Sequence, residues 1–133
     1  MFVEEDRMLA VIPKNHPCAY DEVFPLSALS ESPFMLLEKG ENDVISKIFE
    51  MYGIRPQVHF TTWDDYAIMS MVENELGISI LPELILQRIP YNVVIKELEE
   101  PAYRHIYIGM RDANTLTFAA KRFLEYLPYR HIK

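Results

Sequence analysis

One stretch of the chain, Phe60–Pro82, constrains the fold most, because it joins a helical pattern directly to a buried-strand pattern. Its apolar residues recur at helical spacing at Ile68, Met71, Val72 and Leu76. This spacing predicts a helix with one apolar face. Gly77 follows the last of them and predicts the end of that helix, because glycine readily adopts the left-handed conformation. The apolar run at residues 78–81 then predicts a short buried strand, which Pro82 closes.

The start of this helix carries polar signals. Thr62 with Asp65 three residues later resembles a capping box in which Asp replaces Glu. Asp64 and Asp65 fall in the expected first turn, where negative charge suits the helix dipole. The unit therefore runs from a strand through a polar loop, a helix and a glycine to a second strand. We expect Thr61, Thr62 and the first helical N–H groups to lie at the mouth of a sheet, where small anions and polar ligands bind.

The rest of the chain alternates between predicted strands and helices. Further strands are predicted at residues 7–12, 34–37, 57–60, 92–97 and 105–110, and further helices at residues 43–52, 83–89 and 116–127, with a short helical turn before Ser30. Gly53 is the predicted C-cap of the helix at 43–52. The last helix is predicted to turn four residues inward: Phe118, Ala119, Phe123 and Leu127. The alternation predicts an α/β fold with a mixed, mostly parallel sheet flanked by helices.

Composition limits the class of protein. The chain has 133 residues, half of them apolar, which is enough for one buried core. Its net charge of −7 excludes direct binding to DNA or RNA, which requires a basic surface. No apolar run reaches the ~20 residues of a membrane helix, and the start has no secretory signal pattern. The single cysteine, Cys18, cannot form an internal disulfide, which predicts a reducing, cytoplasmic location.

No pattern in the sequence predicts catalysis, a metal site or a cofactor. The four histidines are far apart and lack metal-binding spacing: His16, His59, His105 and His131. Asp64 and Asp65 are adjacent on the predicted helix and therefore point in different directions, so we interpret them as helix-terminus charges and not as an acid–base pair. Cys18 has no partner motif and is interpreted as an ordinary loop thiol in preference to a redox sensor.

A resemblance to the effector-binding domain of LysR-type transcriptional regulators is carried by four segments in order. The first, DRMLAVIPKNHPCA, resembles the family's crossover strand with its following Pro and His-Pro. The second, PFMLLEKGENDVISKIFEMYGIRPQVHF, resembles its strand, loop, helix, Gly-x-x-Pro and strand. The third, VENELGISILP, resembles its Gly-Ile-x-hydrophobic-Leu-Pro signature, and the fourth, RHIYIGMRDANTLTFAAKRFLEYL, resembles its return strand and closing helix. The resemblance covers about Arg7–Leu127.

The resemblance implies a lobe of periplasmic-binding-protein type 2 topology within a partial effector-binding domain (residues 1–133). Residues 13–103 would form a complete second lobe. Residues 7–12 and 104–127 would be the hinge strands and the closing helix of an incomplete first lobe. The family's helix-turn-helix reader and the first half of that lobe have no counterpart in this sequence, so DNA contact is expected only through that N-terminal domain. The implied function is sensing of a small-molecule effector, with control of DNA-bound transcription through lobe closure.

The resemblance and the sheet-edge position together predict the effector site at Thr61, Thr62 and Trp63. The threonine hydroxyls and nearby N–H groups are expected to face the cleft and hold a carboxylate. Thr62 has a second interpretation as a helix cap only. Trp63, the single tryptophan, is predicted to line the cleft, the alternative being that it packs on the lobe surface.

Gly40, Glu41 and Asn42 are predicted to form the second loop of the same site. Gly40 either lets the backbone approach a ligand or simply makes a tight turn. Glu41 would repel an anionic effector, which favours a polar, zwitterionic or cationic one. Asn42 is also the candidate N-cap of the next helix.

The helix predicted at Asp43–Tyr52 has a wide apolar stripe that includes Met51 and Tyr52. In the resembled family, a helix at this place packs against the partner subunit, which implies a homo-oligomer. The exposed apolar surface of this chain is predicted either to self-associate in a non-native way or to weaken solubility. The alternative to a regulator is a stand-alone small-molecule binding protein or a small enzyme on the same topology. An enzyme requires converging acid, base or nucleophilic groups, and the sequence predicts none.

Overall fold

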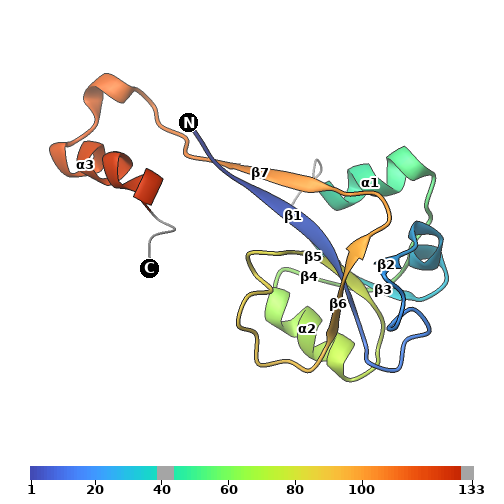
Figure 1. The fold of residues 1–133 in the computed structure, drawn as a ribbon. Coiled ribbons are helices and arrows are strands. Elements are labelled where there is room, and N and C mark those ends of the chain that lie inside the picture. The colour runs from blue at the N-terminus through green and yellow to red at the C-terminus, as the bar shows by residue number, and fades with distance from the viewer. Residues whose placement is uncertain (39–43, 130–133) are drawn as a thin grey trace. The chain divides into compact units, whose positions relative to one another are not determined.

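The computed structural model describes residues 1–38 and 44–129, in which strands and helices alternate (Figure 1). The strands are β1 (Phe2–Ile12), β2 (Val23–Phe24), β3 (Pro33–Leu37), β4 (Gln57–Thr62), β5 (Ser79–Pro82), β6 (Val94–Leu98) and β7 (Tyr103–Tyr107). The helices are α1 (Val44–Tyr52), α2 (Asp65–Glu73) and α3 (Phe118–Tyr126), with short 3-10 segments η1 (Leu26–Ser30), η2 (Ala113–Thr115) and η3 (Leu127–Tyr129). The chain divides into two units, Asp6–Arg104 and Met1–Glu5 with His105–Lys133, and we describe each by itself.

The sheet of the larger unit is built around β1. The strand order is β2-β6-β1-β5, and β7 also pairs with β1. β1 is antiparallel to β5 and to β6, with Leu9 opposite Leu81 on one side and Glu97 on the other. β2 is parallel to β6, and β3 is parallel to β4. The predicted α/β class with a mixed sheet is confirmed. The parallel arrangement does not extend to the neighbours of β1, since β1 brings the chain into this unit and β6 leads it back.

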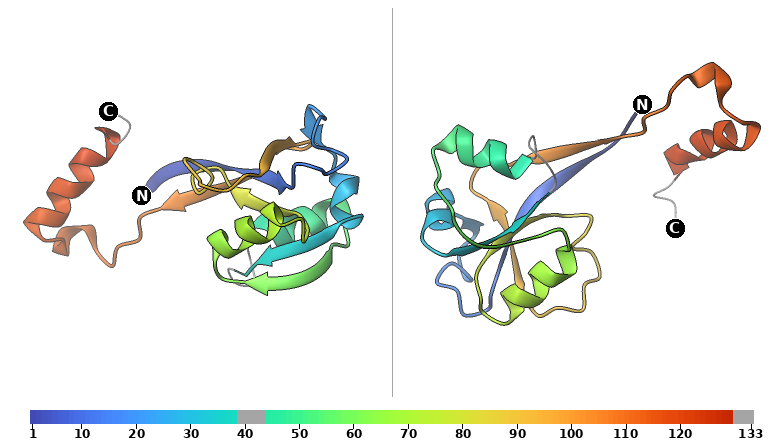
Figure 2. Two further views of the ribbon diagram at one scale, coloured as in Figure 1. Left: turned by 90° about the horizontal axis from the view of Figure 1, so that it is seen from below. Right: turned by 180° about the vertical axis from the view of Figure 1, so that it is seen from behind.

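Helices α1 and α2 cover opposite faces of these strands (Figures 1 and 2). Side chains alternate between the two faces of a strand, so one strand supplies both cores. On β1, Ala10 and Ile12 belong to the core under α1, whereas Leu9 and Val11 belong to the core under α2. The helices contribute Ile45 and Ile48 to the first core and Ile68, Met69 and Val72 to the second. The prediction that the strand at 7–12 lies inside a sheet is confirmed.

Both helices of this unit end in the same hydrogen-bonded motif, but only one uses a glycine. After α1, Gly53 takes φ 63°, and the N–H of Ile54 donates to the carbonyl of Phe49 at 2.9 Å. This Schellman arrangement confirms Gly53 as the C-cap residue. After α2, Glu75 takes the left-handed conformation at φ 65°, and the N–H of Leu76 donates to the carbonyl of Met71 at 3.0 Å. The helix therefore ends before Gly77, and the prediction that Gly77 caps it is wrong. Leu76, predicted on its apolar face, is exposed beyond its end.

Gly77 serves a close approach of two chain segments instead. A Cβ atom at this position would lie 2.4 Å from the carbonyl oxygen of Pro33 and 2.6 Å from Cε of Met35. Beside it, the N–H of Ile78 donates to Pro33 at 2.8 Å, and the N–H of Met35 donates to Ile78 at 2.9 Å. These bonds join β3 and β4 to the β5 side of the unit through a parallel bridge between Phe34 and Ile78.

The segment predicted as a helix at 83–89 is a series of turns. Its first backbone donors are used elsewhere: the N–H of Glu83 bonds the carbonyl of Arg7 at 2.8 Å, and the N–H of Leu84 bonds the Asp6 carboxylate at 3.1 Å. Arg88 takes φ 55°, which lies outside the right-handed helical region. The helix prediction is wrong, since the bonds within this segment are those of turns: the N–H of Ile85 donates to the carbonyl of Pro82 at 3.1 Å, and the N–H of Leu86 donates to the carbonyl of Glu83 at 3.0 Å.

The smaller unit contains the outer ends of β1 and β7 followed by η2 and α3. Its strand ends are joined by a bond of 2.8 Å from the N–H of Ile108 to the carbonyl of Met1. Thr117 caps α3, since its Oγ1 accepts from the N–H of Ala120 at 3.1 Å. The predicted helix is confirmed, but its inward face is wrong: Phe118 and Phe123 are 80% and 60% exposed, and no described residue of α3 is buried. An apolar stripe on a helix predicts a surface that can be buried against another element. It does not show that the other element belongs to this chain.

Among the described residues, no helix has the length and apolar character needed to cross a membrane.

Candidate functional site

The carboxyl ends of β3 and β4 form one edge of the parallel pair. Leu36 lies opposite Thr61, and Leu37 lies opposite Thr62. The N–H of Glu38 donates to the carbonyl of Thr62 at 3.0 Å, so the pairing continues to the last residue described after β3. The chain segments that follow β3 and β4 therefore leave the pair at the same edge. The predicted site residues Gly40, Glu41 and Asn42 belong to the first of these segments and lie outside the described residues.

Thr61 and Thr62 are the last two residues of β4 and not part of a turn. Consecutive strand residues point to opposite faces, and paired residues share a face. Thr62 lies opposite Leu37, which belongs to the core under α2, whereas Thr61 lies opposite Leu36, which packs on the core under α1. Thr61 is exposed and Thr62 is partly exposed. The edge thus presents one hydroxyl on each face, and not two converging hydroxyls in a loop.

The N-cap of α2 is Asp64, and the predictions of Thr62 as the cap and of a Thr62–Asp65 capping box are wrong. Oδ1 of Asp64 accepts from the N–H of Tyr66 at 2.9 Å. Because β4 extends through Thr62, the helix begins two residues later than the capping pattern predicts. Oγ1 of Thr62 accepts from the N–H of Asp64 at 3.2 Å, which leaves its own O–H proton available to donate. Aspartate is as good an N-cap as threonine, so the sequence held two candidates for this position.

Asp64 and Asp65 have different surroundings, as their adjacency predicts. Asp64 is exposed and bound to the helix terminus, whereas Oδ1 of Asp65 is buried without a hydrogen-bond partner. Glu38 is exposed at the same edge. The described part of the edge therefore carries three carboxylates, from Glu38, Asp64 and Asp65. One N–H at the start of α2, that of Tyr66, is thus bonded to the Asp64 carboxylate, whose negative charge disfavours an anion at this terminus.

An aromatic group borders this edge. Trp63 is 68% exposed, so it does not pack into the body of its unit. Tyr66, in the first turn of α2, has its ring centroid 6.4 Å from that of Tyr91 at an interplanar angle of 42°. The Tyr66–Tyr91 pair was not predicted, because its members are 25 positions apart in sequence and no local pattern connects them.

His16 and Ser32 form the contact that most resembles a catalytic pair, and its geometry argues against catalysis. His16 Nε2 lies 3.0 Å from Ser32 Oγ, while His16 Nδ1 accepts from the N–H of Cys18 at 3.1 Å. Neutral His16 therefore carries its proton on Nε2 and donates to Ser32. A base for Ser32 would need the opposite tautomer.

Cys18 is in the same loop. Burial, followed by its hydrogen bond with Asp21, raises the pKa of the Cys18 thiol. A raised pKa keeps the sulfur protonated and unreactive, in agreement with an ordinary loop thiol. In the part of the chain that the structure describes, no group of three or more His, Cys, Asp or Glu side chains is arranged to hold a metal ion.

Comparison with known families identifies one match. Residues 2–130 match the LysR substrate binding domain. Among curated relatives, the HTH-type transcriptional regulator YvbU of Bacillus subtilis (strain 168) is 26% identical over 125 residues, which cover 92% of this chain and 43% of the relative. YwbI of the same organism, also named an HTH-type transcriptional regulator, is 32% identical over 131 residues, which cover 93% of this chain and 42% of the relative. The chain thus spans less than half the length of these relatives. Both relatives are named as transcriptional regulators.

Solved structures of the same family share the fold. The effector-binding domain of QuiR in complex with shikimate superposes with a TM-score of 0.81 at 23% identity, covering 96% of this chain and 63% of that one. The regulatory domain of CcmR from Synechocystis PCC6803 in complex with 2-PG superposes with a TM-score of 0.76 at 20% identity, covering 96% of this chain and 64% of that one. These similarities confirm the predicted periplasmic-binding-protein-like lobe.

Proposed function

Since this chain belongs to the LysR substrate binding domain family, we propose that it is the effector-sensing part of a transcriptional regulator and binds a small molecule at the shared carboxyl edge of β3 and β4. Residues 13–103 are the lobe that carries this site, a proposal supported by the compact unit Asp6–Arg104. Effector binding changes the relation of this lobe to the rest of the regulator and so controls transcription through a separate DNA-binding domain.

The observation that carries the proposal is the joint ending of β3 and β4. Ligands of open α/β sheets bind in the crevice outside the carboxyl ends of the strands. Here that edge presents the accessible hydroxyls of Thr61 and Thr62 and the exposed ring of Trp63. Gly40, Glu41 and Asn42 follow β3 in sequence, and we propose them as further effector-binding residues.

The charges at the edge favour an effector that is not a simple anion. Glu38, Asp64 and Asp65 are all acidic, and Asp64 already fills the terminus of α2. A carboxylate ligand would meet like charges there, whereas a hydroxyl or ammonium group would find acceptors. We therefore propose a neutral polyhydroxy, zwitterionic or cationic effector, with Thr61 and Thr62 bonding its polar groups.

Trp63 supplies a direct assay, because it is the only tryptophan in the chain. A panel of amino acids, amines, polyols and small carboxylates is titrated against the protein, and tryptophan fluorescence is recorded together with the melting temperature. The expected result is a saturable change for a polyhydroxy, zwitterionic or cationic member.

Hydroxyl variants assign the binding to the edge. Thr61→Val and Thr62→Val remove one hydroxyl each at nearly constant shape, whereas Thr62→Ser retains it. Binding should weaken in the two valine variants and persist in Thr62→Ser and in Thr115→Val, which alters a hydroxyl of the smaller unit. A panel in which no compound binds, or a compound whose binding survives both valine changes without altering Trp63 fluorescence, would contradict the proposal.

We also propose that α1 contributes to a homo-oligomer. Its inner face is fixed by Ile45 and Ile48 and by an edge-on contact of Phe49 with Phe34 at 5.3 Å. On its other side Met51 is 73% exposed, and Tyr52 is exposed beside it. Sedimentation should show self-association that Met51→Lys reduces. A clean monomer at high concentration would rule this contact out.

A further inference from the structure

Two neighbouring residues of β1 hold together every strand that pairs with β1. Asp6 is the only charged residue among the described ones with a buried side chain, at 2% exposure. Its Oδ2 accepts from Nε and Nη2 of Arg104 on β7, both at 2.8 Å. Its Oδ1 accepts from the N–H of Leu84, just after β5, at 3.1 Å. Both carboxylate oxygens are therefore bonded, one to each of two strands that flank β1.

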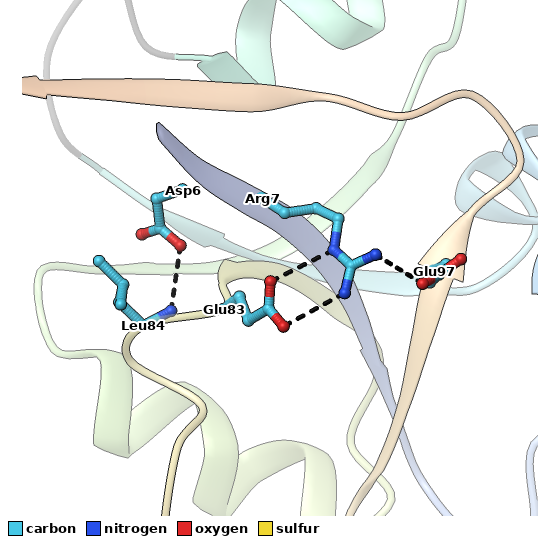
Figure 3. A network of polar contacts seen from close by, with 5 residues as sticks. All are labelled: Asp6, Arg7, Glu83, Leu84 and Glu97. Atoms are coloured by element: carbon cyan, nitrogen blue, oxygen red, sulfur yellow. Dashed lines mark hydrogen bonds and ion pairs between the residues drawn. The ribbon is translucent and has the colours of Figure 1, made fainter. Parts of the chain in front are cut away.

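Arg7 continues the same arrangement on the opposite face of β1. Its Nε and Nη2 each lie 3.2 Å from one oxygen of Glu83, directly after β5. Its Nη1 lies 2.5 Å from Oε1 of Glu97 on β6. Figure 3 shows the Arg7 guanidinium between the two glutamates, with Asp6 and Leu84 beside them. Side-chain bonds from Asp6 and Arg7 thus reach β5, β6 and β7, which are the strands paired with β1.

These bonds lie at the boundary of the larger unit. Asp6 is its first residue and Arg104 is its last. One step further out, Glu5 and His105 belong to the smaller unit and form a pair at 3.0 Å with side chains about half exposed. We propose that Asp6, Arg7, Glu83, Glu97 and Arg104 form a clamp that fixes the two crossing strands to the larger unit.

The difference in burial explains why the clamp resists opening at its centre. The Asp6 side chain is almost fully enclosed, so release of Arg104 would leave a buried carboxylate without its counter-charge. The Glu5–His105 pair is solvated, and its separation exposes little. Opening is therefore opposed most strongly within the clamp, at the buried Asp6–Arg104 pair.

Hydrogen exchange followed residue by residue tests this assignment. The reporters are two amides next to the clamp: Met8, bonded to the carbonyl of Ala102 at 2.8 Å, and Glu83, bonded to the carbonyl of Arg7 at 2.8 Å. The reference is the amide of Met35, bonded to Ile78 at 2.9 Å inside the unit. In Asp6→Asn and in Arg7→Gln, exchange at Met8 and Glu83 should accelerate about tenfold or more while Met35 is unchanged.

A matched control removes an arginine from an exposed pair elsewhere. Arg122→Gln breaks the contact with Glu125 at 2.8 Å on α3 and should leave all three reporter amides unchanged. Arg7→Gln alters a partly exposed side chain and carries the test if Asp6→Asn does not fold. Unchanged exchange at Met8 and Glu83 in the clamp variants would overturn the proposal. Acceleration that is equal at Met35 would also overturn it, since that result indicates general destabilisation and not a local clamp.

Discussion

The sharpest test of the fold concerns Gly77, where the structure leaves no room for a side chain. An alanine Cβ at this position would lie 2.4 Å from the Pro33 carbonyl oxygen, about 1 Å inside the ordinary contact distance of 3.4 Å. The obstacle is backbone, which cannot rotate away as a side chain can. Gly77→Ala must therefore push β3 away from residues 77–79.

The cost follows from what that displacement disturbs. Forcing an extra methyl group into a closely packed site costs about 1–3 kcal/mol. The bonds from Ile78 to Pro33 and from Met35 to Ile78 lie next to the clash, and each is worth about 1 kcal/mol net. We expect Gly77→Ala to lower the free energy of unfolding by about 2–4 kcal/mol, a large share of the roughly 5–15 kcal/mol typical of a domain.

Urea unfolding followed by Trp63 fluorescence measures this change, since Trp63 and Gly77 belong to the same unit. Two other glycines provide controls. Gly53 has open space for a Cβ but takes φ 63°, so Gly53→Ala should cost only the left-handed strain of about 1–2 kcal/mol. Gly109 lies in the smaller unit and has open space and no positive φ, so Gly109→Ala should change the stability reported by Trp63 by less than about 0.5 kcal/mol.

The expected order of destabilisation is Gly77→Ala first, Gly53→Ala second and Gly109→Ala last. A Gly77→Ala protein as stable as Gly109→Ala would refute the close approach of residue 77 to β3. A Gly53→Ala variant that loses more stability than Gly77→Ala would refute the ranking of backbone clash above conformational strain.

Three further changes are measured in the same unfolding assay. Glu75→Gly should stabilise the protein by up to about 1 kcal/mol, because Glu75 holds the left-handed conformation that glycine adopts without strain; no gain would contradict the helix end seen at this residue. Burial lowers the pKa of His16, so His16 in the unfolded chain binds its proton at a higher pH than in the folded chain. The free energy of unfolding should therefore fall as the pH drops below about 6.5. In His16→Gln this part of the pH dependence should disappear, and its persistence would show that other groups cause it. Ser79→Ala should cost about 1–2 kcal/mol, because the buried Ser79 hydroxyl donates to the carbonyl of Met35 at 2.7 Å, and a neutral result would contradict that bond.

The elements that the sequence predicted correctly are those whose signals are local. The strand at 7–12 is apolar on both faces and is buried on both faces. Gly53 ends α1 as its position after the apolar stripe predicts. The failures involve partners distant in sequence. Residues 83–89 have a helical pattern, but their first N–H groups bond to β1, more than 70 positions away. The end of α2 was misplaced because a left-handed glutamate is rare and carries no sequence signature.

The shared edge of β3 and β4 was predicted, but the geometry of the residues at the end of β4 was not. That the chain segments after β3 and β4 share one edge follows from the parallel register, which the alternation of strands and helices already favours. How far β4 extends does not follow, because threonine suits both a strand end and a helix start. Two more strand residues place Thr61 and Thr62 on opposite faces and transfer the cap to Asp64.

The identity of the cap determines what the edge can bind. With Thr62 as the cap, the terminus of α2 would offer N–H groups and a partial positive charge to an anion. With Asp64 as the cap, the N–H of Tyr66 is already bonded to a carboxylate at 2.9 Å, and an anion would have to displace it. Thr62 then accepts from Asp64 and keeps a proton to donate. The edge therefore combines hydroxyl donors with carboxylate acceptors, a combination that suits a ligand with its own hydroxyl or ammonium groups better than one with only a negative charge.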